Sequence, residues 1–103
     1  MSWLSSHEES EKHAAAAREA LRRNDLGRAK ELFAAAAKAE EVALQAITED
    51  KPRTRGITAV SAVALWYKAG QLKKAKRLAR HASALSAMPS FALGQLRELT
   101  GSF

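Results

Sequence analysis

Histidine is the residue type in this sequence best suited to metal binding or to proton transfer near neutral pH. The histidines are His7, His13 and His81, and no two of them have the four-residue spacing of a helical metal site. Glu9 and His13 are four residues apart, which places them on one helix face. A lone pair of this kind on a surface helix is normally solvated rather than a ligand set. We therefore expect no metal site.

The carboxylates also give no sign of a paired acid–base site. Several stand next to each other in sequence, and adjacent helical residues point about 100° apart. The sequence contains no Gly-rich phosphate loop and no nucleophile elbow. We therefore expect a protein that has no cofactor and is not an enzyme. The neighbouring carboxylates are Glu8 and Glu9, Glu40 and Glu41, and Glu49 and Asp50.

Charge is divided sharply between the two halves of the sequence. Residues 1–50 contain seven Lys or Arg and ten Asp or Glu, a formal charge of −3. Residues 51–103 contain ten Lys or Arg and one acid, Glu98, a formal charge of +9. Such an asymmetry is a guide to partners. It fits a specific anionic partner, or an acidic half that solvates the basic half or faces it in a homo-oligomer such as a homodimer.

The densest group of basic residues predicts an alternative function. Five cations between residues 73 and 80 form a stripe on one predicted helix, and phosphate binding needs little more than such a patch. Trp66 and Tyr67 are expected in the core, which leaves no platform for base stacking. Binding of nucleic acid or another polyanion is therefore the alternative to a protein partner. The five cations are Lys73, Lys74, Lys76, Arg77 and Arg80.

The sequence also bears on the compartment. It has no cysteine, which fits a reducing environment. Its first residues lack the basic-then-apolar pattern of a signal peptide. The longest apolar-looking run, residues 56–67, is shorter than the ~20 residues that a membrane-spanning helix needs. We expect a cytoplasmic protein with no membrane association.

Hydrophobic spacing predicts an all-α protein with a single domain. A first helix is expected over residues 6–23, opened by a capping box that starts at Ser5 or Ser6. Asp25 is a good N-cap for a second helix, which should end near residue 49. Glu40 interrupts the apolar stripe of this second helix. We therefore expect the second helix to outrun the first at that point.

The second half of the chain should repeat this arrangement. Pro52 and Gly56 disfavour helix, so we expect a loop over residues 50–56. A nearly all-apolar helix follows, Gly70 ends it, and a basic helix comes next. A short final helix should cover the open end of the stack. The expected ranges are hairpin 1 over about 6–49, hairpin 2 over about 54–87, and a capping helix over about 90–99.

One stretch of the sequence occurs almost twice. Asp25–Ala29, followed by Leu32 and Ala36, returns 46 residues later as Gln71–Ala75, followed by leucine and alanine at the same offsets. Each copy follows a helix-like segment and a short break. A repeat of this length predicts two stacked helical hairpins.

These residues resemble a tetratricopeptide repeat, a family of helix–turn–helix repeats. The resemblance covers about residues 10–88, although the spacing of 46 exceeds the roughly 34 residues of the standard repeat. An unrelated four-helix bundle remains an alternative, because any alanine-rich hairpin gives a similar pattern. The matching residues are Ala17, Leu26, Ala29, Phe33 and Ala36 in the first copy, and Val63, Leu72, Ala75, Ala79 and Ala82 in the second.

The resemblance implies a non-catalytic adaptor with a concave surface that holds a peptide or a partner's helix. The residues that would contact this partner are Arg18 and Arg22 from the first helix and Tyr67 and Lys68 from the third. The cations would favour an acidic ligand. The loop cations Lys51, Arg53 and Arg55 are expected to contribute next. We also expect the protein to self-associate, because two hairpins leave apolar ends and the two halves carry opposed charges.

Overall fold

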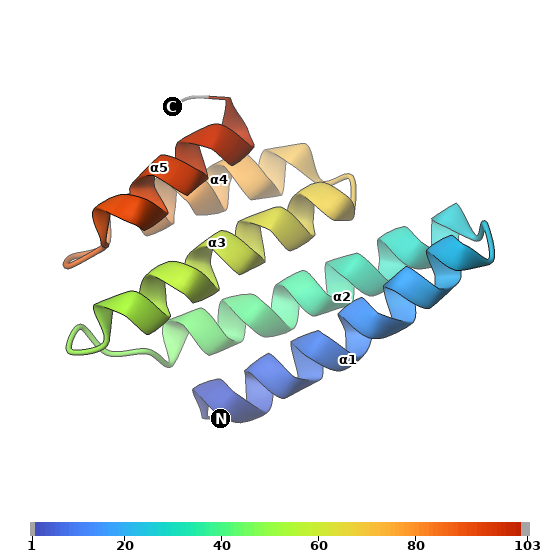
Figure 1. The fold of residues 1–103 in the computed structure, drawn as a ribbon, viewed down its shortest axis with the longest axis horizontal. Helices are drawn as coiled ribbons and strands as arrows, with labels where there is room; N and C mark the ends of the chain where they lie inside the picture. The colour runs from blue at the N-terminus through green and yellow to red at the C-terminus, as the bar shows by residue number, and fades with distance from the viewer. Residues whose placement is uncertain (1, 102–103) are drawn as a thin grey trace.

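The computed structural model describes residues 2–101, which form five α-helices and no strand. Helices α1 and α2 form hairpin 1, α3 and α4 form hairpin 2, and α5 packs on hairpin 2 (Figure 1). The predicted all-α class, with two stacked antiparallel hairpins and a short C-terminal capping helix, is confirmed. The bounds are α1 Trp3–Arg22, α2 Leu26–Gln45, α3 Pro52–Lys68, α4 Leu72–Ser83 and α5 Ser90–Thr100.

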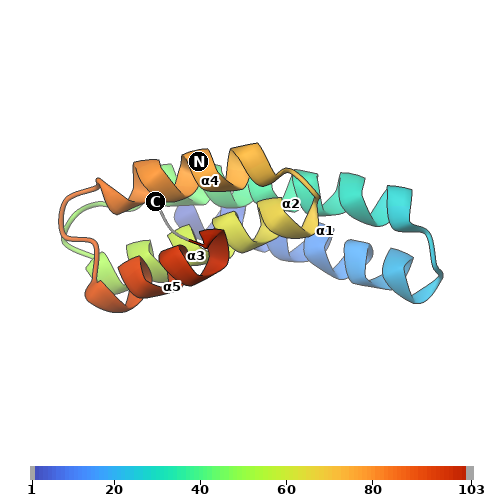
Figure 2. The same ribbon diagram turned by 90° about the horizontal axis from the view of Figure 1, so that it is seen from above.

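The helices alternate between two layers. Figure 2 shows α2 and α4 along one side of the stack and α1, α3 and α5 along the other. Figure 1 shows the α1–α2 turn extending past the ends of α3 and α4. Hairpin 1 therefore projects beyond hairpin 2 and leaves a step in the surface at this end.

The two hairpins share one turn geometry. Asn24 and Gly70, 46 residues apart, both have a positive φ, at 60° and 75°. In each turn, the residue after the one with positive φ donates its backbone N–H to the carbonyl five residues before it. Asp25 donates to Ala20 and Gln71 donates to Trp66, both at 2.9 Å. This is the Schellman arrangement that satisfies the last carbonyls of a helix. The sequence repeat is thus a repeat of backbone conformation.

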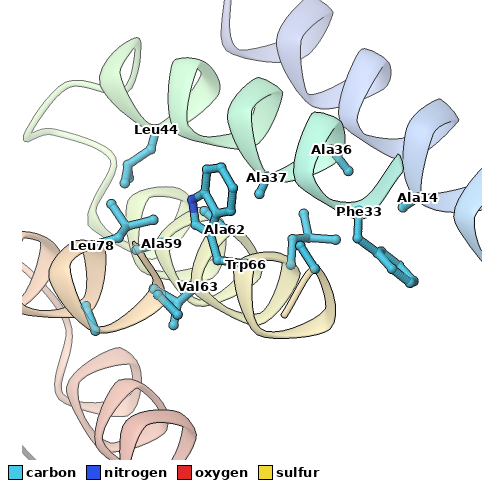
Figure 3. Close-up of a cluster of buried hydrophobic side chains, with 14 of the residues drawn as sticks. Ala14, Phe33, Ala36, Ala37, Leu44, Ala59, Ala62, Val63, Trp66 and Leu78 are labelled. Atoms are coloured by element: carbon cyan, nitrogen blue, oxygen red, sulfur yellow. The ribbon is translucent and has the colours of Figure 1, made fainter. Parts of the chain in front are cut away.

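The core is rich in alanine, which lets helix backbones approach closely. The large side chains occupy complementary places in the two hairpins. Phe33 of α2 corresponds by the 46-residue offset to Ala79 of α4, whereas Ala20 of α1 corresponds to Trp66 of α3. All four are buried. Figure 3 shows the Trp66 ring lying between hairpin 2 and the face of α2 that carries Ala37.

The start of α1 differs from the predicted capping box. The helix begins at Trp3, and the side chain of its N-cap Ser2 accepts a hydrogen bond from the Ser5 backbone N at 3.2 Å. Ser6 lies inside the helix and is buried. The Trp3 Nε1 donates to Thr58 Oγ1 of α3 at 3.0 Å. This contact with hairpin 2 stabilises the additional first turn.

The prediction that α2 outruns α1 at Glu40 is wrong. Both helices have 20 residues and lie side by side (Figure 1). Glu40 is only 1% exposed, and its Oε1 lies 3.0 Å from His7 Nδ1 in a hydrogen bond. A buried carboxylate is costly without a partner, so the histidine explains why an acid is tolerated in the apolar stripe. The His7 ring also stacks on Trp3, with centroids 5.0 Å apart.

The predicted loop over residues 50–56 is also wrong, because α3 begins at Pro52. Proline is well tolerated at the first helical position, where its missing N–H would have no partner. Gly56 lies inside α3 for a different reason. A Cβ at Gly56 would lie 3.0 Å from the Ala92 Cβ and 3.1 Å from the Pro89 Cδ. Glycine at this position therefore permits close contact between α3 and α5.

Helices α2 and α4 end earlier than expected. The second helix ends at Gln45 rather than near residue 49, and the fourth at Ser83 rather than near residue 87. The connection after α4 contains Ala87 at φ 60°, which is incompatible with a continued right-handed helix. The α4 helix is thus the shorter member of hairpin 2.

Candidate functional site

The step at the end of hairpin 1 contains a hollow of about 420 Å³, which we name the tip groove. It lies where the end of α1 and the start of α2 meet the end of α3. Its apolar surface comes from two exposed leucines and the edge of the buried Phe33. The residues used below are Arg18, Leu21, Leu26, Lys30, Phe33 and Lys68.

The tip groove has cations at its rim and no carboxylate among its lining residues. Arg18, Lys30 and Lys68 come from three different helices and are all exposed. The Lys68 Nζ lies 5.8 Å from the centroid of the Phe33 ring, within cation–π range. The groove therefore combines an apolar floor with a positive potential.

Two of the predicted contact residues lie elsewhere. Arg22 is on the outer face of α1, where its Nε donates to Glu19 Oε2 at 2.9 Å. This hydrogen bond, followed by the charge of Arg22, lowers the pKa of Glu19 below its usual value. Tyr67 is half-buried and packs against the core. The structure therefore brings together Arg18 and Lys68 but not Arg22 and Tyr67.

The cations of the 51–55 segment do not form one surface. Lys51 is the exposed N-cap residue of α3, and Arg53 lines a hollow of about 600 Å³ between α3 and α5. Arg55 turns the other way. Its Nη1 donates to the Ser86 carbonyl at 2.9 Å, and its Nη2 donates to the Ile47 carbonyl at 3.3 Å. Arg55 thus ties the two interhelical connections of this end together and has a structural role.

The basic stripe of α4 is divided in the structure. Lys74 and Arg77 face α2 across a hollow of about 440 Å³, which we name the α2–α4 cleft. Lys73, Lys76 and Arg80 are exposed and do not line it. The cleft residues used below are Lys38, Glu41, Trp66, Lys74, Arg77 and His81.

The ion pairs of residues 2–101 all lie in hairpin 1. No cation after residue 50 in that range takes part in one. Among the Lys and Arg residues of α1 and α2, those outside ion pairs in the described chain are Lys12, Arg18, Lys30 and Lys38. Three of these four line the tip groove or the α2–α4 cleft. The unpaired cations therefore gather where the two hairpins meet.

Sequence reasoning missed Lys30, Lys38 and His81 as site residues. Periodicity along one helix predicts which residues share a face, but it does not predict which faces of two helices meet. The sequence repeat gave a partial indication of Lys30. This residue lies 46 positions before Lys76, which is one of the cations predicted to bind a polyanion. No comparable signal in the sequence joins Lys38 of α2 to Lys74 of α4.

The described residues contain no group of three or more His, Asp or Glu side chains placed to hold a metal ion. His7 and His13 contact carboxylates of hairpin 1, at 3.0 Å from Glu40 and 3.7 Å from Glu9. None of the helices within residues 2–101 combines the length and apolarity that crossing a bilayer requires.

No protein-family model, curated protein or solved structure matches this chain. The resemblance to tetratricopeptide repeats therefore remains a prediction that rests on the repeated residues alone.

Proposed function

We propose that this protein is a non-catalytic interaction module that holds an acidic, amphipathic segment of a protein partner in the tip groove. One observation carries the proposal: two exposed leucines and three cations surround a single hollow that no carboxylate lines. Leu21 is 42% exposed and Leu26 is 62% exposed. Apolar residues of a bound helix would cover these side chains, and its acidic residues would face the rim.

The proposal keeps part of what the tetratricopeptide resemblance implies. A partner segment held between the first helices of two hairpins would contact Arg18 and Lys68 in either account. The contribution of α2, through Leu26 and Lys30, replaces that of Arg22 and Tyr67. A role without catalysis and a location in the cytoplasm belong to the same proposal, the latter supported by the absence of cysteine.

A second copy of the chain is one source of an acidic amphipathic segment. The outer face of α1 exposes Leu4 together with Glu8 and Glu11, which share one helix stripe. Light scattering at low and high salt tests this homodimer directly. A dimer that dissociates at high salt is the expected result if the acidic stripe of one copy meets the cations of the other.

Selection from a displayed library of helical peptides tests the proposed function. We expect enrichment of sequences with leucines on one stripe and acids beside it. The double variant Arg18→Glu and Lys68→Glu should bind the selected peptide about tenfold more weakly, a difference of ~1.4 kcal/mol. Lys73→Glu with Arg97→Glu is the matched control, since it changes the charge equally outside the groove. Equal loss in both variants, or enrichment of peptides without acids, contradicts the proposal.

A further inference from the structure

The α2–α4 cleft gathers cations from two helices that no ion pair neutralises within the described chain. Lys38 enters from α2, and Lys74 and Arg77 enter from α4. A second hollow of about 190 Å³ adjoins the cleft and shares Glu41, Leu78 and His81 with it. The two hollows therefore make a continuous track along α4.

The potential in this track is positive despite its one carboxylate. Glu41 Oε2 accepts a hydrogen bond from the Trp66 Nε1 at 2.8 Å, which holds the acid at the floor. Lys38, Lys74 and Arg77 line the cleft with this acid, and Arg55 lines the adjoining hollow. A cleft lined mainly by charges of one sign concentrates the field and raises the local concentration of a ligand of opposite charge.

The aromatic ring at the floor of the cleft is almost completely covered. Trp66 is 3% exposed, and the Lys74 Nζ lies 4.8 Å from the centroid of its ring. An acidic amphipathic peptide would find no exposed leucines here, unlike in the tip groove. A nucleic acid base would find no open ring on which to stack. The unpaired cations of the cleft therefore favour a ligand with repeated negative charge.

The spacing of the cleft residues on α4 suits a chain of such charges. Lys74, Arg77 and His81 follow each other by three and four residues, so they share one face with Cβ separations of about 5–6 Å. The track lies between α2 and α4, which both pack on α3, so its cations can contact one nucleic acid strand along the length of α4. We propose that the α2–α4 cleft binds the sugar–phosphate backbone of single-stranded nucleic acid, without base specificity, through Lys38, Lys74 and Arg77.

Binding of this kind depends strongly on salt. A protein that neutralises three phosphates of a single strand has a slope of log K against log salt of about −2, since each contact contributes about −0.7. Reversing Lys74 and Arg77 together removes two contacts. The slope should then become shallower by about 1.4.

Fluorescence anisotropy with labelled single-stranded RNA and DNA of mixed sequence tests the proposal on the full chain. The cleft variant is Lys74→Glu with Arg77→Glu. The matched control is Lys73→Glu with Lys76→Glu, which makes the same charge change on the same helix outside the cleft. We expect at least about a tenfold loss for the cleft variant and less than about threefold for the control, which corresponds to cleft contacts rather than diffuse attraction.

Lys38→Glu provides a second variant on α2, in case loss of the Lys74–Trp66 contact disturbs folding. It should also weaken binding and make the salt slope shallower. Equal affinities for RNA and DNA would support recognition of the sugar–phosphate backbone. A higher affinity for RNA would assign a role to the 2′-hydroxyl within the same cleft.

Several results overturn the inference. Equal losses in the cleft variant and its control would mean that the charge of α4 acts diffusely. Tighter binding of duplex than of single strands would exclude the proposed track, and equally effective displacement by polyglutamate would assign the cleft to acidic peptides. The tip-groove variant Arg18→Glu with Lys68→Glu should retain nucleic acid binding, which separates this inference from the proposed function.

Discussion

Hairpin 1 and hairpin 2 have the same turn backbone but use their charges differently. Asn24 and Gly70 occupy equivalent positions with positive φ. All ion pairs among residues 2–101, however, belong to hairpin 1, and the cations of hairpin 2 in that range form none. The repeat therefore accounts for the shared turn backbone, whereas the side chains outside the core give the two hairpins different ion pairing. Charges of hairpin 1 are partly neutralised by ion pairs, and no ion pair neutralises the cations of hairpin 2 within residues 2–101.

The exceptions in hairpin 1 refine this comparison. Four cations of α1 and α2 are unpaired, and all of them except Lys12 lie at a surface that hairpin 2 helps to form; these three are Arg18, Lys30 and Lys38. Two of the cations contributed by hairpin 2 stand over aromatic rings, Lys68 over Phe33 and Lys74 over Trp66. A cation held in this way keeps its charge unneutralised and in a fixed place.

The largest effect is expected from the buried pair of hairpin 1. His7→Ala leaves the Glu40 carboxylate buried without its hydrogen-bond partner and removes the stacking on Trp3. We expect a loss of about 2–3 kcal/mol in the free energy of unfolding. Urea denaturation measures it. His13→Ala is the control, since its pair with Glu9 is at the surface, and equal losses for the two variants would contradict a stabilising role for the buried pair.

A smaller effect is expected at the equivalent turn positions. Gly70→Ala forces a side chain into the left-handed region and should cost about 1 kcal/mol. A Cβ there would meet only the Lys30 side chain at 3.7 Å, so no steric clash adds to this cost. Asn24→Gly should change stability by less than about 0.5 kcal/mol, because asparagine already tolerates this conformation. Thermal melts of both variants measure the difference, and a neutral Gly70→Ala would show that the turns are not equivalent.

Removing the cations of hairpin 2 should hardly affect stability. Lys74→Gln with Arg77→Gln takes away two charges that have no ion pair. We expect the free energy of unfolding to fall by no more than about 1 kcal/mol, since only the contact of Lys74 with the Trp66 ring is lost. A loss of more than about 2 kcal/mol in urea denaturation would mean that these cations are structural and would remove the contrast between the hairpins.

The smallest effect concerns the surface pair of Glu19. Its folded-state pKa is lowered, mainly by the hydrogen bond from Arg22, so its contribution to stability is present above the unfolded pKa and is lost as the pH falls through the folded pKa. Glu19→Gln should melt slightly below the unmodified chain at neutral pH, and the difference should disappear once the pH lies below the folded-state pKa of Glu19. Melting curves across this range measure the effect, and a difference that does not change with pH would exclude the ion pair as its cause.

Much of the fold could be predicted from the sequence because its signals are local. The 46-residue repeat predicts two hairpins, and Asp25 and Gly70 predict the cap and the turn that the structure contains. The role of Glu40 could not be predicted, because its partner His7 lies 33 residues away on another helix. Gly56 reads as a helix breaker in the sequence, whereas its function is contact with α5.

The candidate site could be predicted only in part for the same reason. Helical spacing places Arg18 and Arg22 on neighbouring positions of one face, yet Glu19 holds Arg22 outside the groove. Lys38 meets Lys74 only through the packing of α2 against hairpin 2. Sequence periodicity fixes the faces of single helices, and tertiary packing decides which charges come together.

The most direct test of the account is a ¹⁵N–¹H spectrum of the full chain titrated with the selected acidic peptide. The account predicts saturable shifts of the amides around the tip groove, at Arg18, Leu26 and Lys68. The paired outer face of α1, including Glu19 and Arg22, should not respond. Shifts spread over that paired face, or confined to Lys74 and Arg77 of α4, would contradict the proposal that the unpaired cations of the tip groove hold the partner.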